Sequence, residues 1–142
     1  MPSEKMTADI SFVAVDSTDR EAWPVHTDIA ARLSEWTAAD GYLKPGLTIR
    51  ELAETLQINR TYLSEYIKAT YNLSFRDWIS GLRIDYAKRM LLRSPELTIL
   101  EISEKSGFLS LSHFMRTFKE YEECSPARWR RIQTSAEQTP EQ

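Results

Sequence analysis

Apolar residues recur at intervals of three and four positions along most of this chain, which is the spacing of helices that bury one face. The first such pattern predicts a helix over residues 25–38, and Lys44-Pro45-Gly46 breaks the helical pattern after it. Residues 1–22 mix polar residues around one short apolar run, so we expect a loosely ordered leader there. Residues 23–46 are then expected to complete the first subdomain with a helix and a loop.

A hairpin of two short helices is predicted over residues 47–73. Thr48 precedes a helix over residues 49–56, and Glu51 at the third helical position completes a capping box. After a short turn, Asn59 is a suitable cap for a second helix over residues 60–71. Asn72 tolerates left-handed backbone and is expected to end that helix.

The longest helical pattern runs from residue 75 to residue 93, after the capping residue Ser74, and Ser94-Pro95 ends it. Gly81 lies inside this helix at a cost of about 1 kcal/mol relative to Ala. It either permits the close approach of another helix or is tolerated slack. Residues 74–94 are thus expected to form one linker helix close to 30 Å long, at ~1.5 Å per residue.

The order of elements before the linker returns after it, over residues 95–133. Thr98 is expected to cap a helix over residues 99–106, Gly107 to make the turn, and a second helix to follow over about residues 110–121. Ser125-Pro126 then opens a final short helix that we expect to extend through Ile132. Residues 134–142 are predicted to be a disordered tail.

The two hairpins are an internal repeat, because Leu47-Thr48-Ile49-x-Glu51-Leu52-Ala53 resembles Leu97-Thr98-Ile99-x-Glu101-Ile102-Ser103. Each segment precedes a tight turn and a second helix, which is the order of a helix-turn-helix unit. In such a unit a small residue lets the second helix cross closely, and the second helix exposes a polar face sized for the DNA major groove. The linker is nearly as long as the ~34 Å between successive major grooves on one face of a duplex, so the repeat predicts a protein that reads two grooves.

Composition and charge modify this picture only slightly. Hydrophobic residues make up 42% of the chain and charged residues 27%, which is typical of a soluble globular protein, and no apolar run approaches the length of a membrane span. The formal net charge of -3 hides a gradient, because residues 1–46 carry 4 basic and 8 acidic residues whereas residues 47–133 carry 14 and 11. The part with the repeat is therefore basic, which suits a surface that faces phosphates. A helix face exposed only to solvent could carry a similar excess of basic residues.

The segment from Leu47 to Arg131 resembles the DNA-binding domain of the AraC/XylS family of bacterial transcription regulators. The resemblance rests on Leu52-Ala53 and Tyr62-Leu63-Ser64 in the first unit, on Leu82-Arg83-Ile84, Ala87-Lys88 and Leu91-Leu92 in the linker, and on Gly107-Phe108, Phe114, Arg116-x-Phe118-Lys119 and Ser125-Pro126 in the second unit. It implies an all-α fold of about seven helices, in which the linker helix holds two helix-turn-helix subdomains over adjacent major grooves. It also implies sequence-specific binding of double-stranded promoter DNA and recruitment of RNA polymerase, as in an activator.

The resemblance places two sets of side chains toward the grooves. The first set is Arg60, Thr61, Ser64, Glu65 and Lys68, and the second set is Ser112, Met115, Arg116 and Lys119. Basic side chains suit phosphates, hydroxyl groups suit base edges or a thymine methyl group, and a carboxylate can accept a hydrogen bond from a cytosine amino group. The alternative for the first set is solvated helix surface, and the alternative for Arg116 is an ion pair that holds the fold.

Other motif residues are expected to hold the fold, and these are Arg83, Gly107, Phe108, Phe118 and Pro126. Arg83 is assigned to this group because a planar guanidinium in a bridging helix more often ties helices together than contacts DNA. Two positions depart from the family pattern, since Asn72 and Glu123 stand where glycine is frequent. Glu123 therefore predicts local strain or an altered turn.

The sequence gives no pattern for catalysis, and we expect no enzyme activity, no metal site and no cofactor. Cys124 and His113 are eleven positions apart, but no ligand spacing or nucleophile order accompanies them. One cysteine cannot form an internal disulfide, and the N-terminus lacks a signal-peptide core, so a cytoplasmic location is expected.

Two interpretations of the whole chain follow. It is either a minimal regulator or the cytoplasmic output domain of a larger sensor protein, because residues 1–46 leave no room for an effector domain, and we expect no membrane contact by this chain itself. The rival is a helical protein-interaction module that has lost DNA binding. The acidic first third and the apolar segment Leu109-Ser110-Leu111, at the start of the second groove-facing helix, make this rival conceivable.

Overall fold

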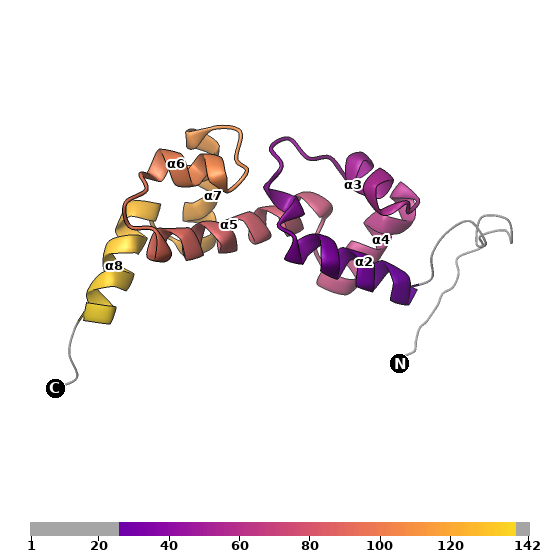
Figure 1. The fold of residues 1–142 in the computed structure, drawn as a ribbon, viewed down its shortest axis with the longest axis horizontal. Helices are drawn as coiled ribbons and strands as arrows, with labels where there is room; N and C mark the ends of the chain where they lie inside the picture. The colour runs from indigo at the N-terminus through magenta and orange to yellow at the C-terminus, as the bar shows by residue number, and fades with distance from the viewer. Residues whose placement is uncertain (1–25, 139–142) are drawn as a thin grey trace, which may run out of the picture.

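A computed structural model describes residues 26–138, so the predicted leader and residues 139–142 of the predicted tail lie outside the described residues. Within this range the chain forms seven α-helices and one short 3-10 helix, and it contains no strand (Figure 1). The elements are α2 (His26–Ala38), η1 (Gly41–Leu43), α3 (Ile49–Leu56), α4 (Arg60–Tyr71), α5 (Phe75–Arg93), α6 (Ile99–Lys105), α7 (Leu111–Glu122) and α8 (Pro126–Gln138). The predicted all-α class is therefore confirmed.

The helices begin at the capping residues that the sequence indicates. In both capping boxes the threonine hydroxyl accepts from the backbone N–H of the glutamate, at 3.1 Å for Thr48 and 3.0 Å for Thr98. The carboxylates of Glu51 and Glu101 accept in return from the two threonine N–H groups. These reciprocal bonds satisfy donors that helix starts otherwise leave unpaired, which explains why two such short helices begin at defined residues.

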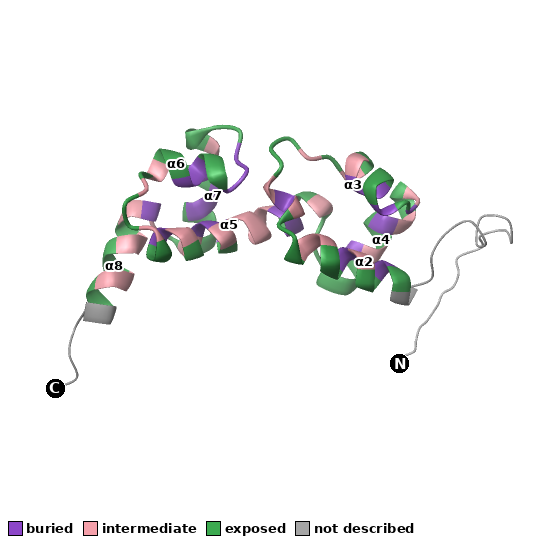
Figure 2. Cartoon of the chain, in the orientation of Figure 1, coloured by how far each residue is buried: buried purple, intermediate pink, exposed green. Residues whose placement is uncertain are grey.

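Two separate hydrophobic cores lie along α5, as the distribution of buried residues in Figure 2 shows. The first core joins α2, η1, α3 and α4 to the N-terminal half of α5 through Trp78 and Ile79. The second core joins α6 and α7 to the C-terminal half of α5 through Ile84, Ala87 and Leu91. One continuous helix therefore belongs to both subdomains, and α3 and α6 lie on the same side of it (Figure 1).

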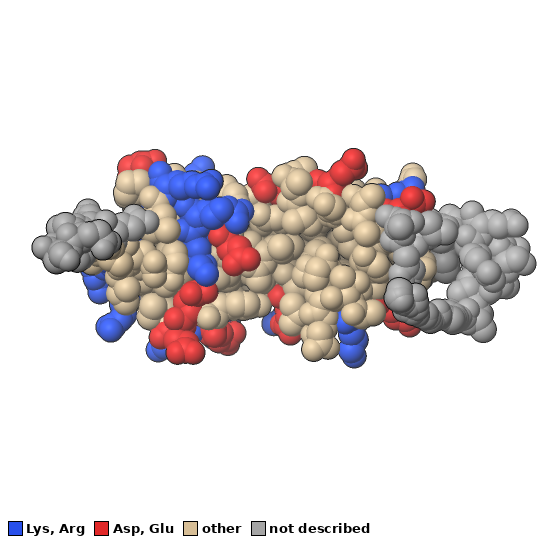
Figure 3. Space-filling view, turned by 90° about the horizontal axis from the view of Figure 1, so that it is seen from below, with Lys and Arg blue, Asp and Glu red and all other residues tan. Residues whose placement is uncertain are grey.

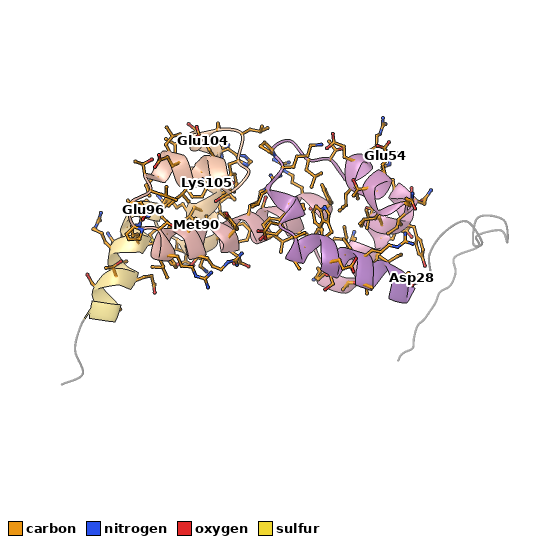
Figure 4. The ribbon with its side chains drawn as sticks, in the orientation of Figure 1. Asp28, Glu54, Met90, Glu96, Glu104 and Lys105 are labelled. Atoms are coloured by element: carbon orange, nitrogen blue, oxygen red, sulfur yellow. The ribbon has the colours of Figure 1, made fainter. Side chains whose placement is uncertain are left out.

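The repeat is visible in the placement of equivalent residues. Glu54 and Glu104 occupy the same position in α3 and α6 and are both exposed, at the upper edge of each hairpin in Figure 4. Asn72 and Glu123 follow α4 and α7 with left-handed backbone, at φ 58° and φ 67°. Of the two alternatives for Glu123, the turn is therefore not altered, and the left-handed region that favours glycine holds an L-residue, which agrees with local strain.

The two subdomains meet where Arg83 contacts the loop after η1. Its guanidinium donates to the carbonyl oxygens of Tyr42 and Lys44, each at 2.7 Å. Gly107 lies at the same junction with φ 89°, and a Cβ atom there would stand 2.7 Å from the Leu43 oxygen and 3.1 Å from the Arg83 Nε. These contacts are of the kind expected of residues that hold the fold, and at position 107 a Cβ atom would be strained both by the positive φ and by the close backbone.

The other predicted structural residues lie in the second subdomain. Phe108 and Phe118 belong to the second core, and Pro126 is fully buried at the start of α8. A Cβ atom at Gly81 would lie 3.7 Å from the Tyr121 ring of α7, which is ordinary van der Waals contact, so the packing of α7 does not require glycine there and the alternative of tolerated slack is favoured. The Tyr121 hydroxyl also donates to the Asp77 carbonyl at 3.1 Å, which fixes α7 against α5.

Three differences from the sequence prediction appear. The final helix does not end near Ile132, and the prediction of a disordered tail is wrong for residues 134–138, because α8 continues through Gln138. The apolar spacing that guided the prediction fades there, but Ala, Glu and Gln are strong helix formers. The 3-10 helix η1 lies where the sequence predicts a loop, and α7 starts at Leu111, one residue after the predicted start, with Ser110 as its cap.

Candidate nucleic-acid interface

The second helix of each hairpin buries one face and exposes the other. In α4 the buried residues are Leu63 and Ile67, and in α7 they are Phe114, Thr117 and Phe118. The caps align the two helices, because Asn59 accepts from the Tyr62 N–H and Ser110 accepts from the His113 N–H. Counting from these caps, Arg60 corresponds to Leu111, Ser64 to Met115, and Lys68 to Lys119.

All nine side chains predicted to face DNA are exposed. In α4 they are Arg60, Thr61, Ser64, Glu65 and Lys68, and in α7 they are Ser112, Met115, Arg116 and Lys119. On each helix they share the face opposite the core residues, as the helical period requires. The structure therefore brings each set together on one surface, and exposure by itself fits both DNA contact and plain solvation.

The interhelical ion pair considered for Arg116 is not formed among the described residues. The ion pairs found there join Lys44 to Glu51 at 3.4 Å and Lys88 to Glu122 at 3.0 Å. Lys88 also lies over the Trp129 ring, 5.7 Å from its centroid. The cation of Lys88 is thus engaged between α5, α7 and α8, whereas Arg116 is an exposed cation with no carboxylate partner in residues 28–136.

An open groove of about 580 Å³ surrounds the turn of the first hairpin. It is lined by Arg50, Ala53, Glu54, Gln57, Ile58, Asn59 and Arg60. The two arginines supply positive charge from both helices of the hairpin, beside residues that suit a phosphate or a base edge. Arg50 was not selected from the sequence, although an exposed basic residue in the first turn of the first helix was a usable signal.

The residues around the turn of the second hairpin are apolar where those of the first are basic. Leu100 stands where the repeat has Arg50, and Leu111 stands where it has Arg60. Leu100, Leu109, Leu111 and Met115 are all exposed. The sequence indicates Leu109 and Leu111 as an unusual apolar segment. It does not single out Leu100, because several apolar residues occur at helical spacing in that region.

His113 lies between the core and the exposed face of α7, with its ring 5.4 Å from that of Phe108. Partial burial and the guanidinium groups of Arg116, Arg76 and Arg83 lower the pKa of His113, while Glu120 opposes them. Guanidinium groups from α5 and α7 therefore act on this ring together, in the same direction as burial. Arg76 was also missed from the sequence, because only the fold brings the start of α5 near α7.

Charge on the underside of the molecule is mixed. Figure 3 shows basic side chains grouped over the half that contains α8, with acidic groups directly beside them. A surface with both signs does not favour phosphate over other partners. The faces of α4 and α7 therefore remain the better candidates for nucleic-acid contact.

Residues 26–138 offer little for other chemistry. No group of three or more metal-ligating side chains occurs in this part of the chain. Cys124 is a free, half-buried thiol. Among the helices described, none combines the length and the apolar character needed to cross a bilayer.

Comparison with known proteins agrees with this geometry. A family model described as a helix-turn-helix domain matches residues 52–132. The melibiose operon regulatory protein of Escherichia coli (strain K12) is 32% identical over 93 residues, which are 66% of this chain and 30% of that protein. The chain thus spans less than a third of the length of this relative.

Solved structures give the same fold. The C-terminal domain of AraT, a response regulator from Geobacillus stearothermophilus, matches with a TM-score of 0.66 and 30% identity, over 76% of this chain and 86% of that one. The DNA-binding domain of AdpA, solved in complex with a target DNA, matches with a TM-score of 0.67 over 77% of this chain and 95% of that one. At 18% identity this second likeness concerns the fold alone.

Proposed function

The chain belongs to the AraC-type helix-turn-helix family of transcription regulators, and from this premise we propose that it binds double-stranded promoter DNA sequence-specifically, with α4 and α7 in adjacent major grooves. The observation that carries the proposal is the continuous helix α5, whose two halves belong to two different cores. Its 19 residues make a helix roughly 28 Å long, at about 1.5 Å per residue. This length suits two successive grooves on one face of B-form DNA.

The exposed residues of α4 have the chemistry for both kinds of DNA contact. Arg60 and Lys68, together with Arg50 beside them in the groove, are proposed to bind phosphates. Thr61, Ser64 and Glu65 are proposed to contact base edges, because hydroxyl and carboxylate groups match the donors and acceptors of the major groove. In α7, Arg116 and Lys119 are proposed to bind phosphates, and Ser112 to contact a base.

The family consists of DNA-binding regulators and is not a family of enzymes. We propose that the protein acts in the cytoplasm as an activator that recruits RNA polymerase. Because the chain spans 30% of the E. coli relative, the attachment of an effector or sensor domain is also part of this proposal. A helical module that binds only protein is the second candidate, favoured by the exposed leucines of the second hairpin.

Selection of bound sites from random duplexes tests the proposal, followed by measurement of affinity against salt concentration. We expect an enriched motif with two half-sites, and affinity that falls steeply with salt as phosphate-bound counterions are released. A protein-interaction module would enrich no motif, and apolar docking to its partner would tolerate salt. Absence of any enriched motif would therefore reject DNA reading in favour of the second candidate.

A further inference from the structure

Three large apolar side chains are exposed around the start of α7. The exposed fraction is 74% for Leu109, 39% for Leu111 and 37% for Met115. Leu111 and Met115 are four residues apart in one helix and therefore lie side by side on its surface. Ser110, which caps α7 with extended backbone at φ -147° and ψ 153°, separates Leu109 from Leu111, so Leu109 directly precedes the start of the helix.

This apolar group continues into the polar face of the same helix. Ser112, Arg116 and Lys119 are exposed on α7 next to Met115, and the ion pairs of the described residues leave both cations free. A cationic border fits a polyanion better than it fits an apolar protein surface. The charge around the leucines thus points to DNA as the occupant of this surface.

The first hairpin lacks this apolar group. Arg60 stands in place of Leu111 and Ser64 in place of Met115, and Leu109 has no counterpart, because the cap Asn59 corresponds to Ser110. The two hairpins share their capping pattern and their buried faces, so they differ in the exposed side chains and in the length of the turn, which runs over residues 57–59 in the first hairpin and 106–110 in the second. The second hairpin therefore presents a different chemistry to the same kind of groove.

The major groove offers one apolar group on the edges of its bases, the C5-methyl group of thymine. We propose that Leu109, Leu111 and Met115 contact thymine methyl groups, so that the half-site bound by α7 is selected for thymine by apolar contact rather than by hydrogen bonds. This inference rests on the proposed function. It assigns specificity to a helix whose polar base-reading residues are few.

Replacement of thymidine by deoxyuridine tests the inference, because it removes only the methyl group. The probe is a duplex selected from a random library, with deoxyuridine placed in one half-site at a time, and affinity is measured by fluorescence anisotropy. Each contacted methyl group is expected to contribute about fourfold in affinity, from ~0.8 kcal/mol per buried methylene-sized group. Deoxyuridine in the α7 half-site should therefore weaken binding several-fold, and more than the same change in the α4 half-site.

Variants identify the side chains that sense the methyl group. Leu109→Ala and Met115→Ala should weaken binding to the thymidine duplex and make the two duplexes equal in affinity. Ser64→Ala, at the position of α4 that matches Met115, should leave the deoxyuridine effect in the α7 half-site unchanged. All three residues are exposed, and circular dichroism checks that each variant keeps its helices.

The outcomes separate this inference from the function on which it rests. A protein that binds a two-part motif without thymine in the α7 half-site, or that binds both duplexes equally, overturns the inference and leaves DNA reading intact. If Leu109→Ala and Met115→Ala each distinguish the thymidine duplex from the deoxyuridine duplex as well as the wild type does, the inference is also overturned. The exposed leucines would then be assigned to an apolar protein partner. A chain that binds no duplex fails both.

Discussion

The two helix-turn-helix subdomains have nearly the same backbone and present different surfaces. Both begin with a Thr-x-x-Glu capping box, and both end their second helix in left-handed backbone. Around the first turn the exposed residues include Arg50 and Arg60, whereas the second turn has Leu100 and Leu111 at those positions. The residues that determine the helices are thus not the residues that determine the surface. One fold can therefore present two chemically different surfaces on the same linker helix.

The subdomains also differ in how they are built into the molecule. The residue that ends the first helix of the hairpin is Gln57 in left-handed backbone, and Gly107 takes the corresponding place in the second hairpin. Gln57 lies at an open groove, but Gly107 lies against Leu43 of the first subdomain and against Arg83 of α5. The second turn therefore carries a contact between the subdomains, whereas Gln57 in the first turn faces an open groove.

The largest effect is expected from a change in the DNA that separates the two readers. Insertion of five base pairs between the half-sites rotates one groove by about half a turn on ~10.5-bp DNA, and a rigid α5 cannot follow. Loss of one of two linked contacts should lower affinity by about a hundredfold or more. Binding is measured against a duplex with the same five base pairs placed outside the site, and undiminished affinity for the interrupted site would show that one hairpin suffices.

Substitution of alanine at the two turns should separate the subdomains by stability. At Gly107 the new Cβ would stand 2.7 Å from a backbone oxygen at φ 89°, and a cost above about 2 kcal/mol is expected from strain of this kind. At Gln57, which already has a Cβ at φ 58°, alanine should change the free energy of unfolding by less than about 0.5 kcal/mol. Urea denaturation measures the free energy of unfolding of both variants. Equal effects of the two substitutions would show that Gly107 is not required at the junction between the subdomains.

The sequence predicts structural features that depend on a few neighbouring residues, such as the starts and ends of helices. The Thr-x-x-Glu boxes and Ser94-Pro95 indicated the starts of α3 and α6 and the end of α5, because capping and proline geometry act over a few residues. The nine proposed DNA-facing positions are exposed as helical spacing required, although their contact with DNA stays a prediction.

Long-range contacts were beyond the sequence. The guanidinium of Arg130 donates to the carbonyl oxygens of Leu91, Ser94 and Leu97, at 2.8, 3.2 and 3.1 Å, and thereby holds the end of α5 against α8. Arg32 donates in a similar way to Leu56 at the end of α3. Carbonyl groups are present at every residue, so no sequence pattern shows which of them an arginine will bind.

The charge difference between equivalent positions gives the next prediction. Glu65 of α4 corresponds to Arg116 of α7. Arg116→Ala should lower affinity for selected and scrambled duplexes by similar factors and reduce the log-log salt slope by about one unit. Glu65→Ala should instead change preference at a few bases, by about 1–3 kcal/mol. A lowered melting temperature for Arg116→Ala with an unchanged salt slope would give Arg116 a structural role.

A smaller difference is expected inside the two cores. Ser103 is buried and its hydroxyl has no hydrogen-bond partner among the described residues, whereas the repeat has buried Ala53 at the same place. Removal of an unsatisfied hydroxyl should stabilise the fold, so Ser103→Ala is expected to raise the free energy of unfolding by about 1 kcal/mol and Ala53→Ser to lower it by a similar amount. Urea denaturation measures the pair, and destabilisation by Ser103→Ala would mean that the hydroxyl is satisfied in solution.

The smallest effect is a pH dependence confined to the second subdomain, because Tyr62 occupies the place of His113 in the first. Folding lowers the pKa of His113 through burial and nearby guanidinium groups, so the folded state favours the neutral ring. The contribution of His113 to stability is therefore complete at a pH above 6.5, its pKa in the unfolded chain. This contribution is lost as the pH falls through the lower pKa of the folded state. Between pH 7 and pH 5, His113→Gln should lose less stability than the wild type, as followed by urea denaturation. An NMR titration of His113 with a midpoint at or above 6.5 would contradict this, since protonation would then not oppose folding.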